Sequence, residues 1–162
     1  AEEALLRGAD VVLVSGPSAL QASPGIRLIK IETAAQMREA VLKEYDDCQI
    51  VIKAAAVADY RVQEVADNKI KKSDALLTLV LEKNPDILFE LGQRKKTGQI
   101  LIGFAAETQN LLEFAQAKLQ KKNLDMIVAN DVSQKDAGFN VDTNRIKLLS
   151  ANGDREDFPL LS

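Results

Sequence analysis

The sequence has no histidine, no tryptophan and a single cysteine, Cys48, among its 162 residues. One cysteine cannot form an internal disulfide, and a chain without histidine cannot build a Cys/His zinc site. The same absences exclude Ser-His-Asp and Cys-His catalysis within the chain. Any general acid or base must therefore be an Asp, Glu, Lys or Tyr side chain, or must come from a substrate.

Long hydrophobic runs and strong basic charge are absent as well. No apolar run reaches the roughly 18 residues that a membrane-spanning helix needs, and the first residues resemble an amphipathic helix rather than a signal peptide. The formal net charge is -3, so the surface as a whole does not attract nucleic acid. We therefore expect a cytoplasmic protein with neither a membrane nor a nucleic acid as its partner.

The residues that are present indicate one α/β domain over residues 1–162. A hydrophobic fraction of 46% is enough for a sizeable core. Short β-branched runs alternate with helical patterns, which predicts a Rossmann-like three-layer αβα fold with a mainly parallel sheet. Gly8 suits the end of a first helix, and Thr33 with Gln36 forms a capping box. Strands are expected at 10–14, 26–31, 48–56, 76–81, 99–104 and 125–129, and helices at 33–46, from Asn84-Pro85 onward and at 108–122.

Two further segments complete the predicted fold. Residues 59–74 are polar and contain Lys69, which is typical of a mobile loop. Residues 145–150 and 157–161 flank the turn at 152–154, which predicts a C-terminal β-hairpin. This hairpin would make the otherwise parallel sheet a mixed one.

Ligands of an open α/β sheet bind beyond the carboxyl ends of its strands. Four junctions of this kind occur here, at residues 54–60, 82–88, 103–108 and 129–132. Each is a predicted strand end followed by small or polar residues. Because such ends meet at one edge of a sheet, a nucleotide-sized anion site is expected there.

Each local signal also has an ordinary structural explanation. Spacing alone favours alanine packing for Ala54 and Ala55, with Asp59 capping a turn. Lys118 and Lys122 are four residues apart on a predicted helix, so they could clamp a polyphosphate, although a solvated basic face is the commoner reason for such a pair. Phe104 could stack on a base or belong to the core.

Six motifs taken together are more specific than any one of them. They are VSGP (14–17), AAVADYR (55–61), KIKK (69–72), KNPDIL (83–88), GFAAET (103–108) and LDMIVANDVS (124–133), followed by GFN (138–140). With this order and these spacings, the chain resembles bacterial phosphopantothenate–cysteine ligase, the ligase domain of the DNA/pantothenate metabolism flavoprotein family. The resemblance spans nearly the whole sequence.

The resemblance implies a reaction in two halves within coenzyme A biosynthesis. CTP would activate 4′-phosphopantothenate as an acyl-cytidylate, and L-cysteine would then form the amide. It also implies Mg²⁺ bound with CTP, no flavin and no protein metal site in this domain, and a homodimer. Preference for CTP over ATP comes from the resemblance alone. A reaction of this kind depends on positioning and charge neutralisation, so it agrees with a chain that has no histidine.

The resemblance also implies roles for particular residues. Lys69 would be the catalytic lysine of a loop that closes on the activated intermediate. The residues expected to bind substrate or nucleotide are Ala54, Ala55, Asp59, Pro85, Asp86, Ile87, Leu88, Phe104, Lys118, Lys122 and Asn130, with Asp131 beside Asn130 at the pantothenate end.

One departure from the family pattern and two alternatives complete the sequence argument. The family begins with a strand and a Gly/Ser-rich loop that nothing before Ala1 supplies, so weak or no activity is expected of this chain as given. A dinucleotide-dependent oxidoreductase would need a G-x-G-x-x-G turn, whereas only Gly16 precedes Gly25 after the first strand. A non-catalytic nucleotide-binding domain would keep the core but need not keep Asp59, Lys69 and Lys118.

Overall fold

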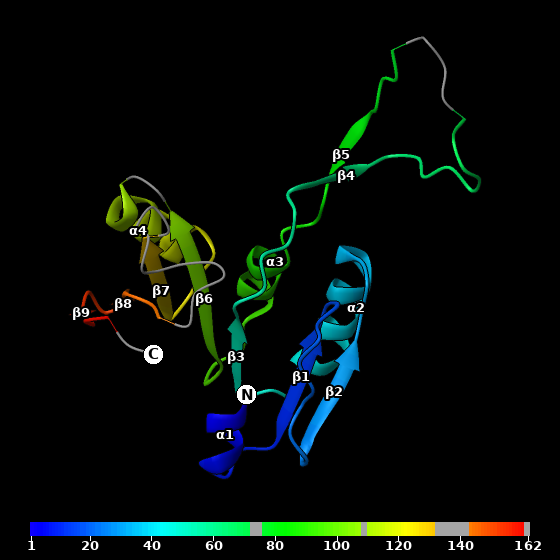
Figure 1. Ribbon diagram of the computed structural model, residues 1–162. Coiled ribbons are helices and arrows are strands. Elements are labelled where there is room, and N and C mark those ends of the chain that lie inside the picture. The colour runs from blue at the N-terminus through cyan, green and yellow to red at the C-terminus, as the bar shows by residue number, and fades with distance from the viewer. Residues whose placement is uncertain (72–75, 108–109, 132–142, 161–162) are drawn as a thin grey trace. The chain divides into compact units, whose positions relative to one another are not determined.

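The computed structural model describes residues 1–71, 76–107, 110–131 and 143–160, with the side chains of Glu107 and Asp131 left out (Figure 1). The chain divides into two compact units. Unit 1 comprises Ala1–Val41 and Ala56–Asp86, and unit 2 comprises Leu42–Ala55 and Ile87–Ser162. The expectation of one domain over 1–162 stays a prediction.

Unit 1 begins with a short helix and a pair of parallel strands. Helix α1 (Glu2–Leu6) ends at Arg7, and Gly8 follows with a φ of 85°, which confirms the glycine expected at that helix end. Strand β1 (Val11–Ser15) pairs in parallel with β2 (Ile26–Lys30).

Helix α2 (Ala34–Tyr45) begins in unit 1 and carries the predicted capping box. The N–H of Gln36 donates to Thr33 Oγ1 at 3.2 Å, and the N–H of Thr33 donates to Gln36 Oε1 at 3.0 Å. Each residue therefore satisfies a main-chain donor of the other, which confirms the start of this helix within one residue.

The remaining strands of unit 1 correct two predictions. Strand β4 (Tyr60–Val62) lies within the segment expected to be a loop, and it pairs antiparallel with β5 (Leu81–Lys83). The expected strand at 76–81 is wrong except for Leu81. The pairing depends on residues about 20 positions apart, such as Arg61 and Glu82, whose side chains form a 2.7 Å ion pair. No pattern among neighbouring residues of the sequence predicts such a strand pairing.

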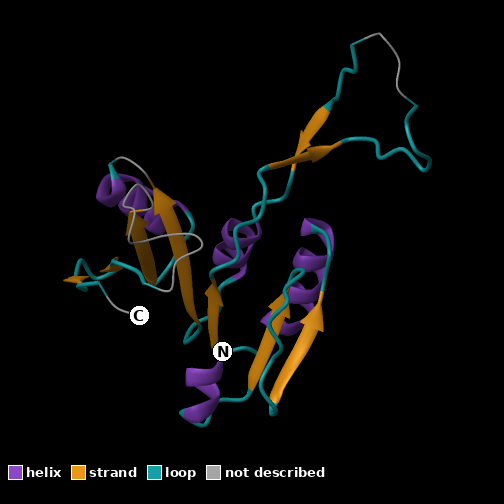
Figure 2. Ribbon diagram, viewed as in Figure 1, coloured by secondary structure: helices purple, strands orange, loops and turns teal. Residues whose placement is uncertain are grey.

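Unit 2 contains a five-stranded sheet in the order β3-β6-β7-β8-β9. Figure 2 draws its strands in orange, and Figure 1 labels them in the same view. Strands β3 (Ile50–Lys53), β6 (Ile100–Glu107) and β7 (Met126–Asp131) are parallel. Strands β8 (Ile146–Ser150) and β9 (Arg155–Asp157) are antiparallel additions. This arrangement confirms the α/β class, the mainly parallel sheet and the C-terminal hairpin.

The C-terminal hairpin is tighter than expected, because β9 begins at Arg155 rather than at residue 157. Gly153 has a φ of 96°, and the N–H of Ser150 donates to the carbonyl of Asp154 at 2.9 Å. The chain therefore reverses direction within a few residues and pairs at once.

Helices α3 (Ile87–Arg94) and α4 (Leu111–Lys121) both contact strand β6 of this sheet, and α4 also contacts β7. A Cβ added to Gly103 in β6 would come within 2.8 Å of the side chains of Leu88 and Leu124. A Cβ added to Gly92 in α3 would come within 1.9 Å of the carbonyl oxygen of Lys122. Gly103 therefore lets β6 lie close to α3 and to the segment after α4. Gly92 lets α3 lie close to the end of α4. The core that these elements enclose includes Leu91, Leu101, Ala105, Ala115, Leu119, Ile127 and Ala129, each 3% exposed or less.

The starts of both helices also differ from the sequence expectation. Helix α3 begins at Ile87 rather than at Asn84-Pro85, and α4 begins at Leu111 rather than at residue 108. The Asn84 side chain donates to the Ala58 carbonyl at 2.8 Å and accepts from Arg61 at 2.9 Å. Its amide is therefore used at the base of the β4–β5 hairpin and not as a helix cap.

Candidate functional site

The carboxyl ends of β3, β6 and β7 lie at one edge of the unit 2 sheet, because the three strands are parallel neighbours. We call this the carboxyl edge. Ala54 and Ala55 follow β3, Phe104 lies in the second half of β6, and Asn130 lies next to the last residue of β7. The structure thus brings together at this edge several residues that are distant in sequence, as the strand pattern predicted.

Ala54 and Ala55 are exposed and leave the main chain accessible at the end of β3. The last residue of that strand, Lys53, donates from Nζ to the carbonyl of Ala55 at 2.9 Å. This ammonium therefore holds the chain where it leaves the sheet. Lys53 was not among the predicted site residues, although a lysine that ends an apolar strand is a signal that could have indicated it.

At the start of α3, the main chain rather than the side chains is available to bind a ligand. Ile87 and Leu88 are 3% and 6% exposed, so their side chains belong to the core. Because α3 leads back to the start of β6, its first turn lies toward the carboxyl edge, where its N–H groups suit a phosphate or a polar base edge. The expected role of Ile87 and Leu88 is therefore compatible with backbone contacts only.

Phe104 has an exposed ring. It is 42% exposed, and it alternates along β6 with Gly103 and Ala105, which face the two helices. The ring therefore lies on the opposite face of the sheet, where Ile50 and Ile52 are also more than half exposed. A planar ligand could stack on this side chain, which is one of the two roles that the sequence left open for Phe104.

Asn130 carries an unusual feature. Its Oδ1 atom is buried, and no described residue donates to it. The same holds for Asn144, two residues before Ile146, which pairs with Asn130 across β7 and β8. Buried acceptors without donors are rare in proteins, so each could accept from water or from a ligand. No sequence signal singled out Asn144. The side chain of Asp131 lies outside the described residues.

Lys118 lies in the second half of α4 (Leu111–Lys121), and Lys122 lies at its C-terminal end. Helix α4 joins two parallel strands, so it runs antiparallel to them and ends near their amino ends. Lys122 is the C-cap residue, and its carbonyl lies against Gly92. Lys118 lies one helical turn, about 5.4 Å, closer to the carboxyl edge. Both side chains are partly buried and have interaction partners.

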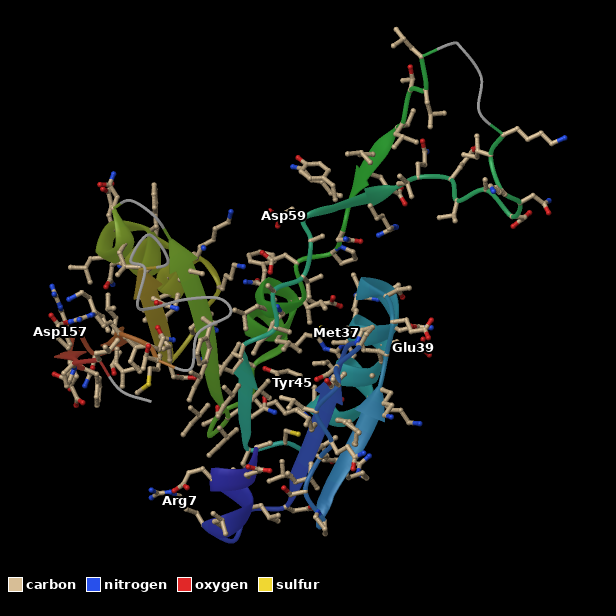
Figure 3. The ribbon with its side chains drawn as sticks, viewed as in Figure 1. Arg7, Met37, Glu39, Tyr45, Asp59 and Asp157 are labelled. Atoms are coloured by element: carbon tan, nitrogen blue, oxygen red, sulfur yellow. The ribbon has the colours of Figure 1, made fainter. Side chains whose placement is uncertain are left out.

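Four expected site residues belong to unit 1, and all four are exposed. Asp59, labelled in Figure 3, lies directly before β4. Its main-chain carbonyl accepts from the N–H of Asn84 at 2.8 Å, which closes the base of the β4–β5 hairpin. Lys69 lies in the segment that joins the two hairpin strands. Pro85 and Asp86 lie between β5 and α3.

The clearest shifts in pKa concern residues outside this predicted set. Hydrogen bonds from Arg155 and Lys147 lower the pKa of Asp157 to about 2. A hydrogen bond from Lys96 lowers the pKa of Asp46, and burial raises the pKa of Tyr45. These groups belong to structural contacts, such as the 2.7 Å hydrogen bond that the Tyr45 hydroxyl donates to the Leu91 carbonyl.

Within the described ranges, no group of three or more His, Cys, Asp or Glu side chains is arranged to hold a metal ion. No helix in the described part of the chain is long and apolar enough to cross a membrane.

Comparison with known protein families shows to which family the chain belongs. Residues 1–162, the whole sequence, match the family described as the DNA/pantothenate metabolism flavoprotein C-terminal domain. The chain belongs to this family.

Members of this flavoprotein family with curated names resemble the chain strongly. The coenzyme A biosynthesis bifunctional protein CoaBC of Bacillus subtilis (strain 168) is 50% identical over 163 residues, which cover 100% of this chain and 40% of that protein. The corresponding protein of Vibrio cholerae is 45% identical and is covered over 41% of its length. The chain thus spans well under half of these relatives.

Solved structures agree with the fold. The C-terminal domain of the coenzyme A biosynthesis bifunctional protein CoaBC superposes with a TM-score of 0.82 at 40% identity, covering 99% of this chain and 70% of that one. A Cab2 mutant in complex with phosphopantothenate-cysteine gives a TM-score of 0.65 at 19% identity, covering 83% and 47%, and so supports the fold alone. The expected Rossmann-like α/β fold is confirmed.

Proposed function

We propose that this flavoprotein-family domain is a phosphopantothenate–cysteine ligase of coenzyme A biosynthesis that uses CTP. The observation that carries the proposal is the carboxyl edge of unit 2, where Ala54, Ala55, Phe104 and Asn130 lie at the ends of three adjacent parallel strands. The name of the CoaBC relatives, which match over the entire chain, supports the same activity.

The proposed reaction has two steps. A carboxylate oxygen of 4′-phosphopantothenate attacks the α-phosphorus of CTP, and pyrophosphate leaves with the electrons of the broken P–O bond. The amine of L-cysteine then attacks the acyl carbon and loses a proton as CMP leaves. Both steps need oriented reactants and neutralised charge more than a protein nucleophile.

The residues of the chain have separate tasks in this scheme. The first-turn N–H groups of α3, preceded by Pro85 and Asp86, would hold part of the nucleotide, and Phe104 would stack on it. Asp59 would contact a substrate. Lys69, exposed in the hairpin loop, would neutralise charge on the acyl-cytidylate during amide formation. Asn130 and Asp131 would shape the pantothenate end.

Mg²⁺ would accompany CTP and offset charge on its phosphates. Mg²⁺ that is bound with a nucleotide is commonly held by one or two carboxylates, phosphates and water rather than by a cage of protein ligands. We therefore name no protein ligand for it. No flavin is expected in this domain, and the homodimer and the cytoplasmic location also remain predictions.

The direct test is pyrophosphate release by the full-length protein supplied with CTP, Mg²⁺ and 4′-phosphopantothenate. We expect release that depends on phosphopantothenate, and an amide product only after L-cysteine is added. If CTP binds but no pyrophosphate forms with any combination of substrates, the domain is a nucleotide-binding module without ligase activity. Stabilisation by NADH instead of CTP would favour the oxidoreductase alternative.

A further inference from the structure

Polar contacts at the base of the β4–β5 hairpin converge on Asn84. The Asn84 side chain donates from Nδ2 to the Ala58 carbonyl at 2.8 Å, and its Oδ1 accepts from Arg61 Nη1 at 2.9 Å. Its N–H donates to the Asp59 carbonyl at 2.8 Å. Arg61 Nη2 forms the 2.7 Å ion pair with Glu82. We call these five residues the Asn84 network, and it joins the two sides of the hairpin through side chains as well as main chain.

The local sequence explains why Asn84 belongs to the hairpin. Pro85 follows it, and a proline disfavours the helical conformation for the residue before it, so Asn84 continues the direction of β5 instead of opening α3. Its N–H bond to Asp59 adds one position to the pairing of the two strands. The side chain is then free to bind Ala58 and Arg61.

The paired part of the hairpin is short. The register runs from Tyr60 opposite Lys83 to Val62 opposite Leu81, and the N–H of Gln63 adds one bond beyond it. Figure 1 shows that the chain on both sides continues well beyond β4 and β5. A two-stranded hairpin is marginally stable in water, so the ladder alone holds this segment weakly. The contacts of the Asn84 network therefore fix the direction that the hairpin takes from its base.

Lys69 lies far from this base along the chain. It follows Arg61 by eight residues, and an extended chain rises about 3.3 Å per residue, so up to about 26 Å can separate the two. A small change of angle at the base therefore becomes a large displacement of the Lys69 ammonium. A misplacement of about 1 Å at a reacting group can slow a reaction on the order of a hundredfold. The position of Lys69 thus depends on how firmly the base is held.

We propose that Asn84 and Arg61 are positioning residues for the second half-reaction, because they fix the base of the hairpin that carries Lys69. The inference rests on the proposed function, in which Lys69 acts during amide formation. Neither Asn84 nor Arg61 contacts a substrate in this scheme. Arg61 suits the task because its planar guanidinium binds two acceptors at once, the Glu82 carboxylate and the Asn84 amide oxygen.

The nucleotide contacts proposed for α3 do not depend on the Asn84 network. Ile87 and Leu88 open that helix and are 3% and 6% exposed, so the core of unit 2 holds its first turn in place. The network itself is close to the solvent, since the side chains of Arg61 and Glu82 are 45% and 41% exposed. Exposed ion pairs contribute little to folding stability. Variants of Asn84 and Arg61 should therefore fold and bind CTP.

Single-turnover measurement of the two half-reactions in the full-length protein tests the proposal. Asn84→Ala keeps the N–H bond to Asp59 and loses only the side-chain contacts. In Asn84→Ala and Arg61→Ala, we expect pyrophosphate release from CTP and 4′-phosphopantothenate within about twofold of the unmodified rate, and amide formation slowed about tenfold or more. Acyl-cytidylate should accumulate in both. Equal slowing of the two steps, or unchanged amide formation, overturns the proposal.

Gln63→Ala is the matched control. Gln63 is exposed, lies two residues after Arg61, and joins the hairpin pairing through its main-chain N–H, which alanine keeps. Both half-reactions should run at the unmodified rate in this variant.

Two more variants separate positioning from charge. Arg61→Lys keeps the positive charge without the planar fork, so it should restore little of the amide rate. Because Arg61 and Asn84 act as one unit, combining the two alanine variants should slow amide formation no further than the slower single variant. Full recovery in Arg61→Lys, or multiplied losses in the double variant, contradicts the proposal.

Hydrogen exchange reports on the hairpin independently of catalysis. Asn84→Ala should speed exchange of the Gln63 N–H about tenfold, because two hydrogen bonds at the base are lost. The N–H of Leu101 in unit 2, which donates to the Asp125 carboxylate at 2.7 Å, should keep its protection. Unchanged exchange at Gln63 means that the Asn84 network does not hold the base, and it overturns this proposal alone. No pyrophosphate release from the unmodified protein would instead overturn the proposed function, and with it the role in amide formation.

Discussion

The helices of unit 2 and the hairpin of unit 1 use the same residue type in opposite ways. Leu91 in α3 is 0% exposed, whereas Leu79 beside β5 is 58% exposed. In unit 2 the apolar residues form a core, and two glycines allow the helices and the strand around it to approach one another closely. In the hairpin the apolar side chains are exposed. Apolar content alone therefore does not separate a buried core from an exposed surface.

The largest effect expected from this comparison concerns Gly92→Ala. Glycine to alanine in a helix normally stabilises by up to about 1 kcal/mol, but here the new Cβ would meet the Lys122 carbonyl at 1.9 Å. We expect unit 2 to lose about 3 kcal/mol or more, because main chain cannot move aside as a flexible side chain can. Chemical denaturation measures the loss. Gln93→Ala, at the exposed next residue, should change little, and a stable Gly92→Ala protein would contradict the close packing.

The next effect compares two leucines directly. Leu91→Ala should cost about 2–5 kcal/mol of folding stability, because it leaves a cavity in the core. Leu79→Ala should cost less than about 0.5 kcal/mol in a dilute, monomeric sample. Denaturation at low protein concentration measures both. A comparable loss in the two variants would show that the hairpin side chain is buried within its own chain.

The smallest expected effect is on the pH dependence of folding stability, through the C-terminal hairpin. The pKa of Asp157 is lowered to about 2, from an ordinary value of 3.8, by Arg155 and Lys147. Ionised Asp157 therefore stabilises the folded state above pH 3.8, and this contribution is lost as the pH falls through about 2.

Asp157→Asn should flatten the acid side of the stability profile between these pH values and leave the neutral side nearly parallel to that of the unmodified protein. Melting curves from pH 2 to 7 measure this. The effect is small because the ion pairs are solvent-exposed, with an exposed fraction of 49% for the Asp157 side chain. An unchanged acid limb would contradict the assignment.

The sequence predicted the features that depend on neighbouring residues. The capping box of Thr33 and Gln36, the glycine after α1 and the apolar parallel strands all follow from local pattern. The β4–β5 pairing was missed because it joins segments that are far apart in sequence. The same pairing recruits Asn84, so the residue that looked like a helix cap has another partner.

The candidate site shows the same limit. Strand ends predicted that Ala54, Phe104 and Asn130 share an edge, because parallel strands must align. Helical spacing placed Lys118 and Lys122 on one side of α4, but it could not show that Lys122 lies at the helix end that is farther from the carboxyl edge. Asn144 has no sequence signal at all, since its buried acceptor depends on the packing of β8.

The position of the two lysines along α4 makes their proposed roles unequal. Lys118 is one turn closer to the carboxyl edge than Lys122. Lys118→Ala should therefore weaken CTP binding more than Lys122→Ala does, and titration calorimetry compares the two. Equal effects would indicate that the nucleotide does not approach from the carboxyl edge.

The central proposal is that unit 2 holds the nucleotide while Lys69 of the hairpin acts in amide formation. Calorimetric CTP affinity, measured on Lys118→Ala and Lys69→Ala with the unmodified protein, tests it most directly. Loss of a charge-assisted contact costs about 1.5–3 kcal/mol, so Lys118→Ala should bind CTP about tenfold or more weakly. Lys69→Ala should bind CTP unchanged yet form the amide slowly. Unaltered CTP affinity in Lys118→Ala, or an equal loss in Lys69→Ala, would contradict this division of tasks.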